Sequence, residues 1–266
     1  MDAAVLVERR QRALWITINR PQAHNALNRA VSEGLAGAVE GAAGEAGIRA
    51  VVLTGAGERS FCAGADLKEG QSAEGRSTFS SGGGDNPLVR VLRAMRSCPV
   101  PVIGRINGAA LGGGLGLVSG CDLVYAAEHA RFGTPEVKVG VFPMMITAHL
   151  IRQLPRRRYW EMAYLGEPLS AQEAQAFHLI NRAVPGHELD ALIESVLERL
   201  CANSPNALRA GKLALEVMQD LNVEQSLAYA QLVIEKLAQS EEAREGMQAF
   251  AQKRPPAWAV PPKDAA

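Results

Sequence analysis

Short, mainly apolar segments alternate with glycine-rich turns and with helical spacing, and this alternation restricts the fold more than any other feature of the chain. The segments comprise residues 50–53, 100–106 and 123–126. Gly55 and Gly57 follow the first segment, and a glycine cluster at 108–116 follows the second. Short apolar runs of this kind are typical of parallel strands with both faces covered. The pattern therefore predicts an α/β fold with short parallel strands.

The two ends of the chain show different patterns. Alternating apolar residues at 14–18 predict a strand, and a similar alternation at 5–7 indicates its hairpin partner. Beyond residue 144, helical patterns dominate. We therefore expect a core domain at residues 1–195 and a C-terminal helical region at residues 196–266, which docks on the core or on another subunit.

Composition and charge argue against several classes of protein. The 266 residues include 28 Lys and Arg and 28 Asp and Glu, so the formal net charge is zero, which argues against a nucleic-acid partner. The most apolar stretch, 109–125, contains five glycines and one aspartate and is too short for a membrane span. The four cysteines show no metal-binding spacing, and the first residues show no signal-peptide pattern. We expect a cytoplasmic protein with no metal site and no membrane association.

Two segments combine accessible backbone with small side chains. Residues 60–68, with Gly64 near the centre, follow the first predicted strand, and residues 112–116 follow the second. The glycine cluster lacks the spacing of a phosphate-binding loop and of a dinucleotide-binding turn. Taken singly, each segment also fits a tight structural turn. Together, two amides at the ends of neighbouring strands can form an oxyanion hole, which needs no side chain.

Several motifs jointly resemble the enoyl-CoA hydratase/isomerase (crotonase) superfamily. They are FCAGADLK, NGAALGGGLGL, GCDL and ARFGTPEVKVGVFP, and NRPQAHNAL, SAQEAQAFHLINRAVP and AFAQKRPPAW match as well. The resemblance covers nearly the whole chain. It implies a crotonase-like spiral of repeated ββα units with a C-terminal helical trimerisation region.

The resemblance also implies a substrate and a set of site residues. The substrate would be an acyl-CoA thioester, so coenzyme A is part of the substrate and no separate cofactor is expected. The backbone amides of Ala65 and Gly113 would hold the thioester oxygen. The further positions implied to bind substrate or coenzyme A are Ala26, Ala63, Asp66, Leu67, Lys68, Gly112, Phe250 and Lys253. The last two reach coenzyme A in the family, sometimes across a subunit boundary, and the implied assembly is a homotrimer or a dimer of trimers.

The hydratases of this family carry two glutamates, and the chain matches only one of them. Glu136, in GTPEVKVG, matches the first. The second belongs three residues after the oxyanion glycine, where this chain has Gly116. Apart from the resemblance, Glu136 also fits a surface ion pair.

A single carboxylate is compatible with more than one activity. We expect first an enoyl-CoA hydratase that converts 2-enoyl-CoA to 3-hydroxyacyl-CoA with one catalytic glutamate. A Δ3–Δ2 enoyl-CoA isomerase, which moves a proton between Cγ and Cα, is the alternative. A noncatalytic acyl-CoA-binding protein is a third interpretation. Residues 69–86 are rich in Ser, Gly and charged residues, which is typical of a lid or a disordered segment. The substrate's own carboxylate, or a side chain from this predicted lid, can supply the missing group.

Overall fold

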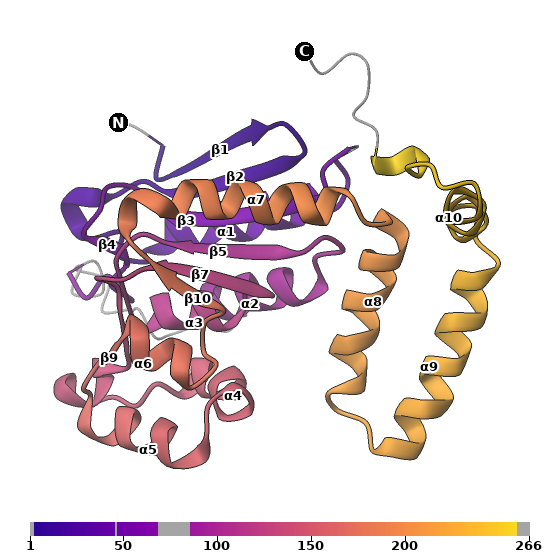
Figure 1. Cartoon of the computed structure of the whole chain (residues 1–266). Coiled ribbons are helices and arrows are strands. Elements are labelled where there is room, and N and C mark those ends of the chain that lie inside the picture. Colours follow the sequence, from indigo (N-terminus) through magenta and orange to yellow (C-terminus); the bar gives the residue numbers. More distant parts are fainter. Residues whose placement is uncertain (1–2, 46, 69–85, 260–266) are drawn as a thin grey trace.

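The computed structural model describes residues 3–45, 47–68 and 86–259. Within these residues, six strands form the larger of two sheets, in the order β1-β2-β3-β5-β7-β10 (Figure 1). Their bounds are Val5–Arg10 (β1), Ala13–Ile18 (β2), Ala50–Gly55 (β3), Val102–Ile106 (β5), Leu123–Ala127 (β7) and Arg182–Val184 (β10). β1 pairs antiparallel with β2, and the other neighbouring strands are parallel. The predicted α/β class and the N-terminal hairpin are confirmed.

A second, smaller sheet carries the segments that matter for function. Its order is β4 (Ser60–Cys62), β6 (Ala109–Leu111), β8 (Arg131–Gly133) and β9 (Leu169–Ser170). β4, β6 and β8 are parallel, and β9 is antiparallel to β8. Strands of two or three residues are too short to show a period, so the apolar pattern does not predict this sheet.

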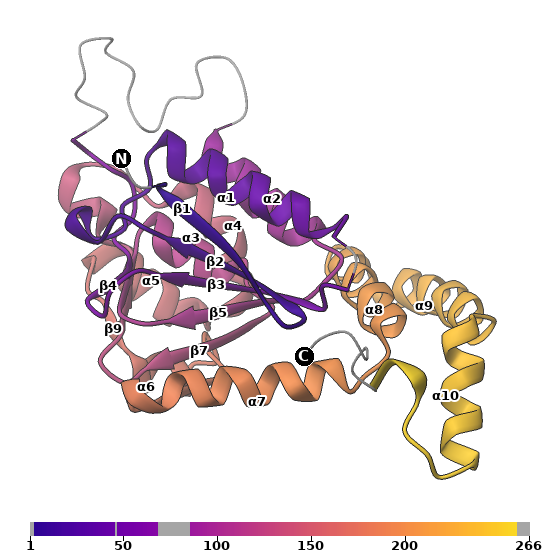
Figure 2. The ribbon, with the colours of Figure 1, turned by 90° about the horizontal axis from the view of Figure 1, so that it is seen from above.

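Helices cover both faces of the larger sheet (Figure 2). On one face, Leu14, Ile16 and Ile18 of β2 pack in the same core as α1 (Arg29–Ala42) and α2 (Pro87–Ser97). On the other face, Ala13 and Trp15 pack with α7 (Leu189–Cys201). The alternation along β2 therefore separates two buried faces, as parallel strands between helical layers require.

The other helices surround the small sheet or extend from the core. Their bounds are Gly113–Ser119 (α3), Met144–Gln153 (α4), Arg156–Leu165 (α5), Ala171–Ala176 (α6), Pro205–Met218 (α8), Val223–Ala238 (α9) and Glu241–Ala251 (α10). Side chains satisfy the first amides of several of them. Asn28 accepts from Val31 N at the start of α1, and Ser170 with Glu173 forms a capping box at α6.

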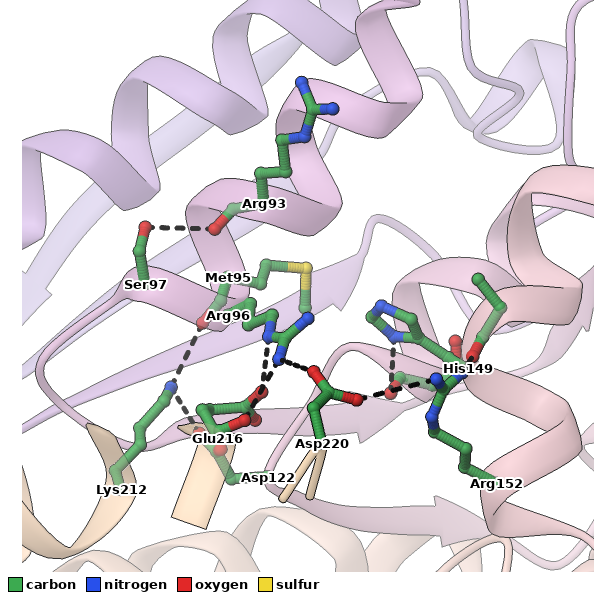
Figure 3. A network of polar contacts seen from close by, with 12 residues as sticks. Arg93, Met95, Arg96, Ser97, Asp122, His149, Arg152, Lys212, Glu216 and Asp220 are labelled. Atoms are coloured by element: carbon green, nitrogen blue, oxygen red, sulfur yellow. Dashed lines mark hydrogen bonds and ion pairs between the residues drawn. The ribbon is translucent and has the colours of Figure 1, made fainter. Parts of the chain in front are cut away.

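Helices α8, α9 and α10 project away from the two sheets (Figures 1 and 2). A buried contact holds α8 to the core: Lys212 Nζ donates to the carbonyls of Met95 and Val100, each at 3.1 Å, and lies 2.7 Å from Asp122 Oδ2 (Figure 3). Farther along, Arg96 pairs with both Glu216 and Asp220. These charges fix the direction in which the C-terminal helices leave the core.

Two sequence expectations concern how the chain is divided. Residue 195 lies within α7, and the division into residues 1–195 and 196–266 stays a prediction. Of the predicted lid, 69–85 lies outside the described residues, while Asn86 caps α2 by accepting from Leu88 N. No described helix has the length and apolar character needed to cross a membrane.

Candidate active site

Three parallel strands of the small sheet end at the same edge. β4 leads into Gly64 and Ala65, β6 leads into Gly112 and Gly113, and β8 leads into the 3₁₀ helix Pro135–Val139. The carboxyl ends of parallel strands lie side by side, so this topology gathers the three segments at one place. The sequence motifs found these segments, and the small sheet explains why they meet.

The backbone at Gly64 touches the backbone of the glycine cluster. Gly64 has φ +91°, in the region that glycine adopts without steric cost. A Cβ atom built there would lie 2.8 Å from the carbonyl oxygen of Leu111 and 3.3 Å from Gly113 N. Glycine is therefore required at position 64, because any side chain would push the two segments apart.

The amides of Ala65 and Gly113 have no hydrogen-bond partner among the described residues. Leu27 N donates to the Gly64 carbonyl at 2.7 Å, and Asp66 N donates to the Leu27 carbonyl at 2.9 Å. In this parallel bridge, the N–H of the intervening Ala65 faces away from Leu27. Gly113 opens α3, where the first amides have no acceptor within the helix. Two unused donors on adjoining segments can stabilise negative charge on an oxygen.

Glu136 lies directly against the glycine cluster. A Cβ atom on Gly112, which has φ +52°, would lie 3.0 Å from Glu136 Oε1 and 3.4 Å from its Cδ. Within the described ranges, Glu136 Oε2 is the buried side-chain oxygen that has no hydrogen-bond partner. Burial raises the pKa of this carboxyl, against a smaller lowering by a backbone hydrogen bond. The surface ion pair considered for Glu136 does not form with any described residue.

A buried tyrosine stands close to this carboxylate. Tyr159 of α5 is 3% exposed, and its hydroxyl pairs with Thr147 of α4. Thr147 in turn donates to the carbonyl of Pro143 at 2.7 Å. Burial first, and the charge of Glu136 as a lesser cause, raise the pKa of Tyr159. This chain of hydrogen bonds ties α5 to the first turn of α4.

The position expected for a second glutamate is filled by an apolar side chain. Gly116 lies in α3 and is buried, and a Cβ atom there would overlap Cγ2 of Ile146, which is 2% exposed. The wall facing this part of the site is therefore hydrocarbon. No side chain can be added at position 116 while Ile146 keeps its place.

A groove of about 690 Å³ adjoins the Ala65 segment. It is lined by Arg20, Gln22, Ala23, His24, Ala26, Asn28, Ala65, Asp66, Leu67 and Lys68. Five of the residues expected from the motifs therefore lie together. Ala63 lies beside the groove and donates its N–H to the His24 carbonyl at 3.1 Å.

The structure does not bring Phe250 and Lys253 to this groove within one chain. Phe250 lies on α10 and is 86% exposed, and Lys253 follows that helix with φ +53°. In Figures 1 and 2, α10 lies far from β4 and β9. Their predicted contact with coenzyme A therefore depends on another subunit.

Two other features lie near α3 and β4. A cavity of about 520 Å³ lies at the far end of α3, but its Gln153 and Asn181 side chains are bonded to the backbone at Ser119 and Val124. Cys62, at the end of β4, is fully buried, which raises its pKa to about 12. A thiol this weakly acidic is not a nucleophile at neutral pH.

Comparison with known proteins decides the family. Residues 8–261 match the family model described as enoyl-CoA hydratase/isomerase. The chain belongs to this family. It is 36% identical to the 2,3-dehydroadipyl-CoA hydratase of Escherichia coli K12, over 95% of this chain and 97% of the relative. It is 32% identical to the short-chain-enoyl-CoA hydratase of Clostridium acetobutylicum, over 94% and 95%.

Solved structures of family members have the same fold. The enoyl-CoA hydratase of Mycobacterium smegmatis matches with a TM-score of 0.91 at 33% identity, covering 97% of this chain and all of that one. The enoyl-CoA hydratase of Mycobacterium tuberculosis H37Rv matches with a TM-score of 0.85 at 35% identity, over 96% and 98%. The crotonase-like fold expected from the motifs is confirmed.

Sequence reasoning did not assign Ile146, Tyr159 or Arg20 to the site of this family member. Ile146 and Tyr159 are apolar or aromatic residues within ordinary helical patterns, so nothing in the sequence distinguishes them from core residues. Arg20 stands within the NRPQAHNAL motif, next to Pro21. Its place within a family motif is the sequence feature that could have assigned Arg20 to the site.

Proposed function

We propose that the protein is an enoyl-CoA hydratase that adds water to the double bond of a 2-enoyl-CoA thioester, with Glu136 as its single catalytic carboxylate. The observation that carries the proposal is the buried, unpartnered Oε2 of Glu136, whose carboxylate lies against Gly112 beside the Gly64–Gly113 contact. The relatives include several hydratases, which supports the same class of reaction.

In the proposed mechanism, the amides of Ala65 and Gly113 bind the thioester oxygen and stabilise the enolate that develops on it. Each such donor contributes about 3 kcal/mol, judged from the loss of oxyanion-hole donors in other enzymes. Glu136 takes a proton from water while the water oxygen bonds to Cβ, and it then delivers that proton to Cα. One water molecule is consumed, and the carboxylate returns to its starting state.

The environment of Glu136 suits both proton transfers. Its pKa is raised by burial, so its carboxylate is a stronger base than that of an exposed glutamate. No cation pairs with it among the described residues, so its charge is available to the substrate. Leu27 and Leu88 lie close to Gly113, and this apolar surface excludes competing water from the thioester.

One observation favours isomerisation as a second candidate. Ile146 fills the place expected for a second, water-orienting glutamate, so Glu136 would have to orient the water alone. A Δ3–Δ2 isomerase needs no water, because Glu136 would remove a proton at one end of the allylic system and return it to the other. The apolar wall suits this reaction.

Incubation with matched 2-enoyl- and 3-enoyl-CoA in heavy water separates the candidates. The proposal predicts 3-hydroxyacyl-CoA from the 2-enoyl substrate, with deuterium at Cα. Conversion of 3-enoyl- to 2-enoyl-CoA without a hydroxylated product would show that the activity is isomerisation and would contradict the proposed hydration. If neither turnover nor exchange at Cα of a bound acyl-CoA occurs, the result would favour a noncatalytic acyl-CoA-binding protein.

The proposed assembly is a homotrimer or a dimer of trimers. Helix α9 has large apolar side chains on one side of its surface, Val223, Leu227 and Ile234, each more than 60% exposed. Such a face is typical of a subunit interface. In the trimer, Phe250 and Lys253 of one subunit would reach the groove of another.

A further inference from the structure

Arg20 links both sides of the short bridge that presents the Ala65 amide. Its Nη1 lies 2.9 Å from Asp66 Oδ2 and donates to the carbonyl of Ala26, also at 2.9 Å. Ala26 directly precedes Leu27, and Asp66 directly follows Ala65. One guanidinium group therefore spans the two segments that the Leu27–Ala65 bridge joins.

The ion pair is well ordered by its surroundings. The side chains of Arg20 and Asp66 are only 20% and 12% exposed. The backbone N–H of Arg20 donates to Asn25 Oδ1 at 3.0 Å, and Asn25 is itself fully buried. A partly buried pair held in this way is screened less by solvent than a surface pair.

The charges of Arg20 and Asp66 affect the proposed reaction because negative charge develops on the nearby thioester oxygen. The Asp66 carboxylate is the next residue after a proposed oxyanion donor, so its negative charge opposes the enolate that develops there. The Arg20 guanidinium compensates this charge. Both contacts come from Nη1, whose two N–H bonds lie in the plane of the guanidinium and therefore have fixed directions, whereas the ammonium of a lysine rotates freely.

We propose that Arg20 is a positioning residue of the reaction. It fixes the Ala65 amide through Ala26 and Asp66, and it cancels the charge of Asp66 beside the developing enolate, without contact to the reacting atoms. This inference rests on the oxyanion hole of the proposed function.

Four variants test the inference: Arg20→Met, Asp66→Asn, the double variant Arg20→Met/Asp66→Asn, and Arg20→Lys. Arg20→Met should lower kcat about tenfold or more with little change in KM, because the loss falls on the transition state. The double variant should regain part of kcat, since it removes the uncompensated charge. Arg20→Lys should lie between the wild type and Arg20→Met. If Arg20→Met does not fold, Asp66→Asn and Arg20→Lys carry the same comparison.

A spectroscopic measurement separates positioning from general damage. Infrared difference spectra of bound butyryl-CoA report how strongly the thioester carbonyl is polarised. The carbonyl stretch should move to higher frequency in Arg20→Met and return partway in the double variant. Arg105→Met is the matched control, because Arg105 is 18% exposed and pairs with Asp190 on α7. Helix α7 lies on the face of the larger sheet opposite α1 and α2. Arg105→Met should leave the stretch unchanged.

The opposite results are equally clear. A raised KM with unchanged kcat and an unchanged carbonyl stretch would make Arg20 a coenzyme A contact and overturn the proposal. Wild-type values in every variant would overturn it too. If the wild type shows no turnover with any enoyl-CoA, the proposed function fails, and the carbonyl stretch of butyryl-CoA still decides the role of Arg20.

Discussion

The Cγ2 methyl of Ile146 occupies the space that a side chain at Gly116 would need. The two residues lie on different helices, α4 and α3, and both are buried. The contact makes glycine at position 116 a packing requirement. It also leaves Glu136 without a second carboxylate on this wall of the site.

Substitution at Gly116 should therefore be tolerated only when Ile146 changes shape. Gly116→Ala should lower the free energy of unfolding by about 1–3 kcal/mol, because the new methyl group overlaps Ile146 Cγ2. Adding Ile146→Leu should recover much of this loss, since leucine has no methyl branch at Cβ. Adding Ile146→Val should not, because valine keeps that branch. Urea unfolding of the three variants measures the difference. Equal recovery by Ile146→Leu and Ile146→Val would contradict the contact between position 116 and Ile146 Cγ2.

Position 64 should not accept alanine. Gly64→Ala adds a Cβ atom at φ +91°, 2.8 Å from the Leu111 carbonyl, and should cost more than about 2 kcal/mol of stability. It should also reduce turnover of the folded fraction, since the Ala65 and Gly113 segments separate. Gly37→Ala is the control: nothing lies within 4 Å of its Cβ position in α1, and alanine there should stabilise by about 0.5–1 kcal/mol. Wild-type stability of Gly64→Ala would contradict the close contact.

The charge of Glu136 should make stability depend on pH. Burial raises the pKa of its carboxyl in the folded state above the ordinary value of about 4.3. Its contribution to stability is therefore present below about pH 4.3 and is lost as pH rises through the folded pKa. Glu136→Gln should be more stable than the wild type at neutral pH, and the difference should vanish in acid. Unfolding in urea across this pH range measures it.

Glu245→Gln is the matched comparison with the opposite sign. A hydrogen bond from Arg254 lowers the pKa of Glu245 to about 2. Its contribution is present above about pH 4.3 and is lost as pH falls toward 2. This variant should be less stable than the wild type at neutral pH. If both variants change the stability at neutral pH in the same direction, the result would contradict the claim that burial raises the pKa of Glu136.

Lys212 should be essential for attaching the C-terminal helices. Its side chain is 7% exposed, and its ammonium donates to two carbonyls and to Asp122, which also accepts from Val102 N (Figure 3). Lys212→Met should cost about 2–4 kcal/mol, because it leaves Asp122 and both carbonyls without this donor. Lys212→Met/Asp122→Asn should recover part of that loss. Arg29→Met, which breaks an exposed pair on α1 with Glu33, should cost less than about 1 kcal/mol. Equal costs for Lys212→Met and Arg29→Met would contradict the role of burial.

The sequence predicts the parts of the site whose chemistry lies in the backbone. Glycines at 64 and 112–113 and the glutamate after Pro135 stand in motifs that are visible without a structure. The short strands β4, β6 and β8, which bring these parts together, are not visible, because three residues show no period. The same limit applies to Ile146 against Gly116 and to Arg20 with Asp66. Each pair is distant in sequence, and its members look ordinary until the fold places them in contact.

Exchange of the Cα protons of butyryl-CoA in heavy water tests the central proposal most directly. This saturated thioester cannot be hydrated, so exchange reports only enolate formation by a base near Cα while the carbonyl oxygen is held. The account predicts exchange by the wild-type protein and a loss of about 100-fold or more in Glu136→Gln, with butyryl-CoA still bound. Equal exchange rates in the two proteins at equal occupancy would contradict it.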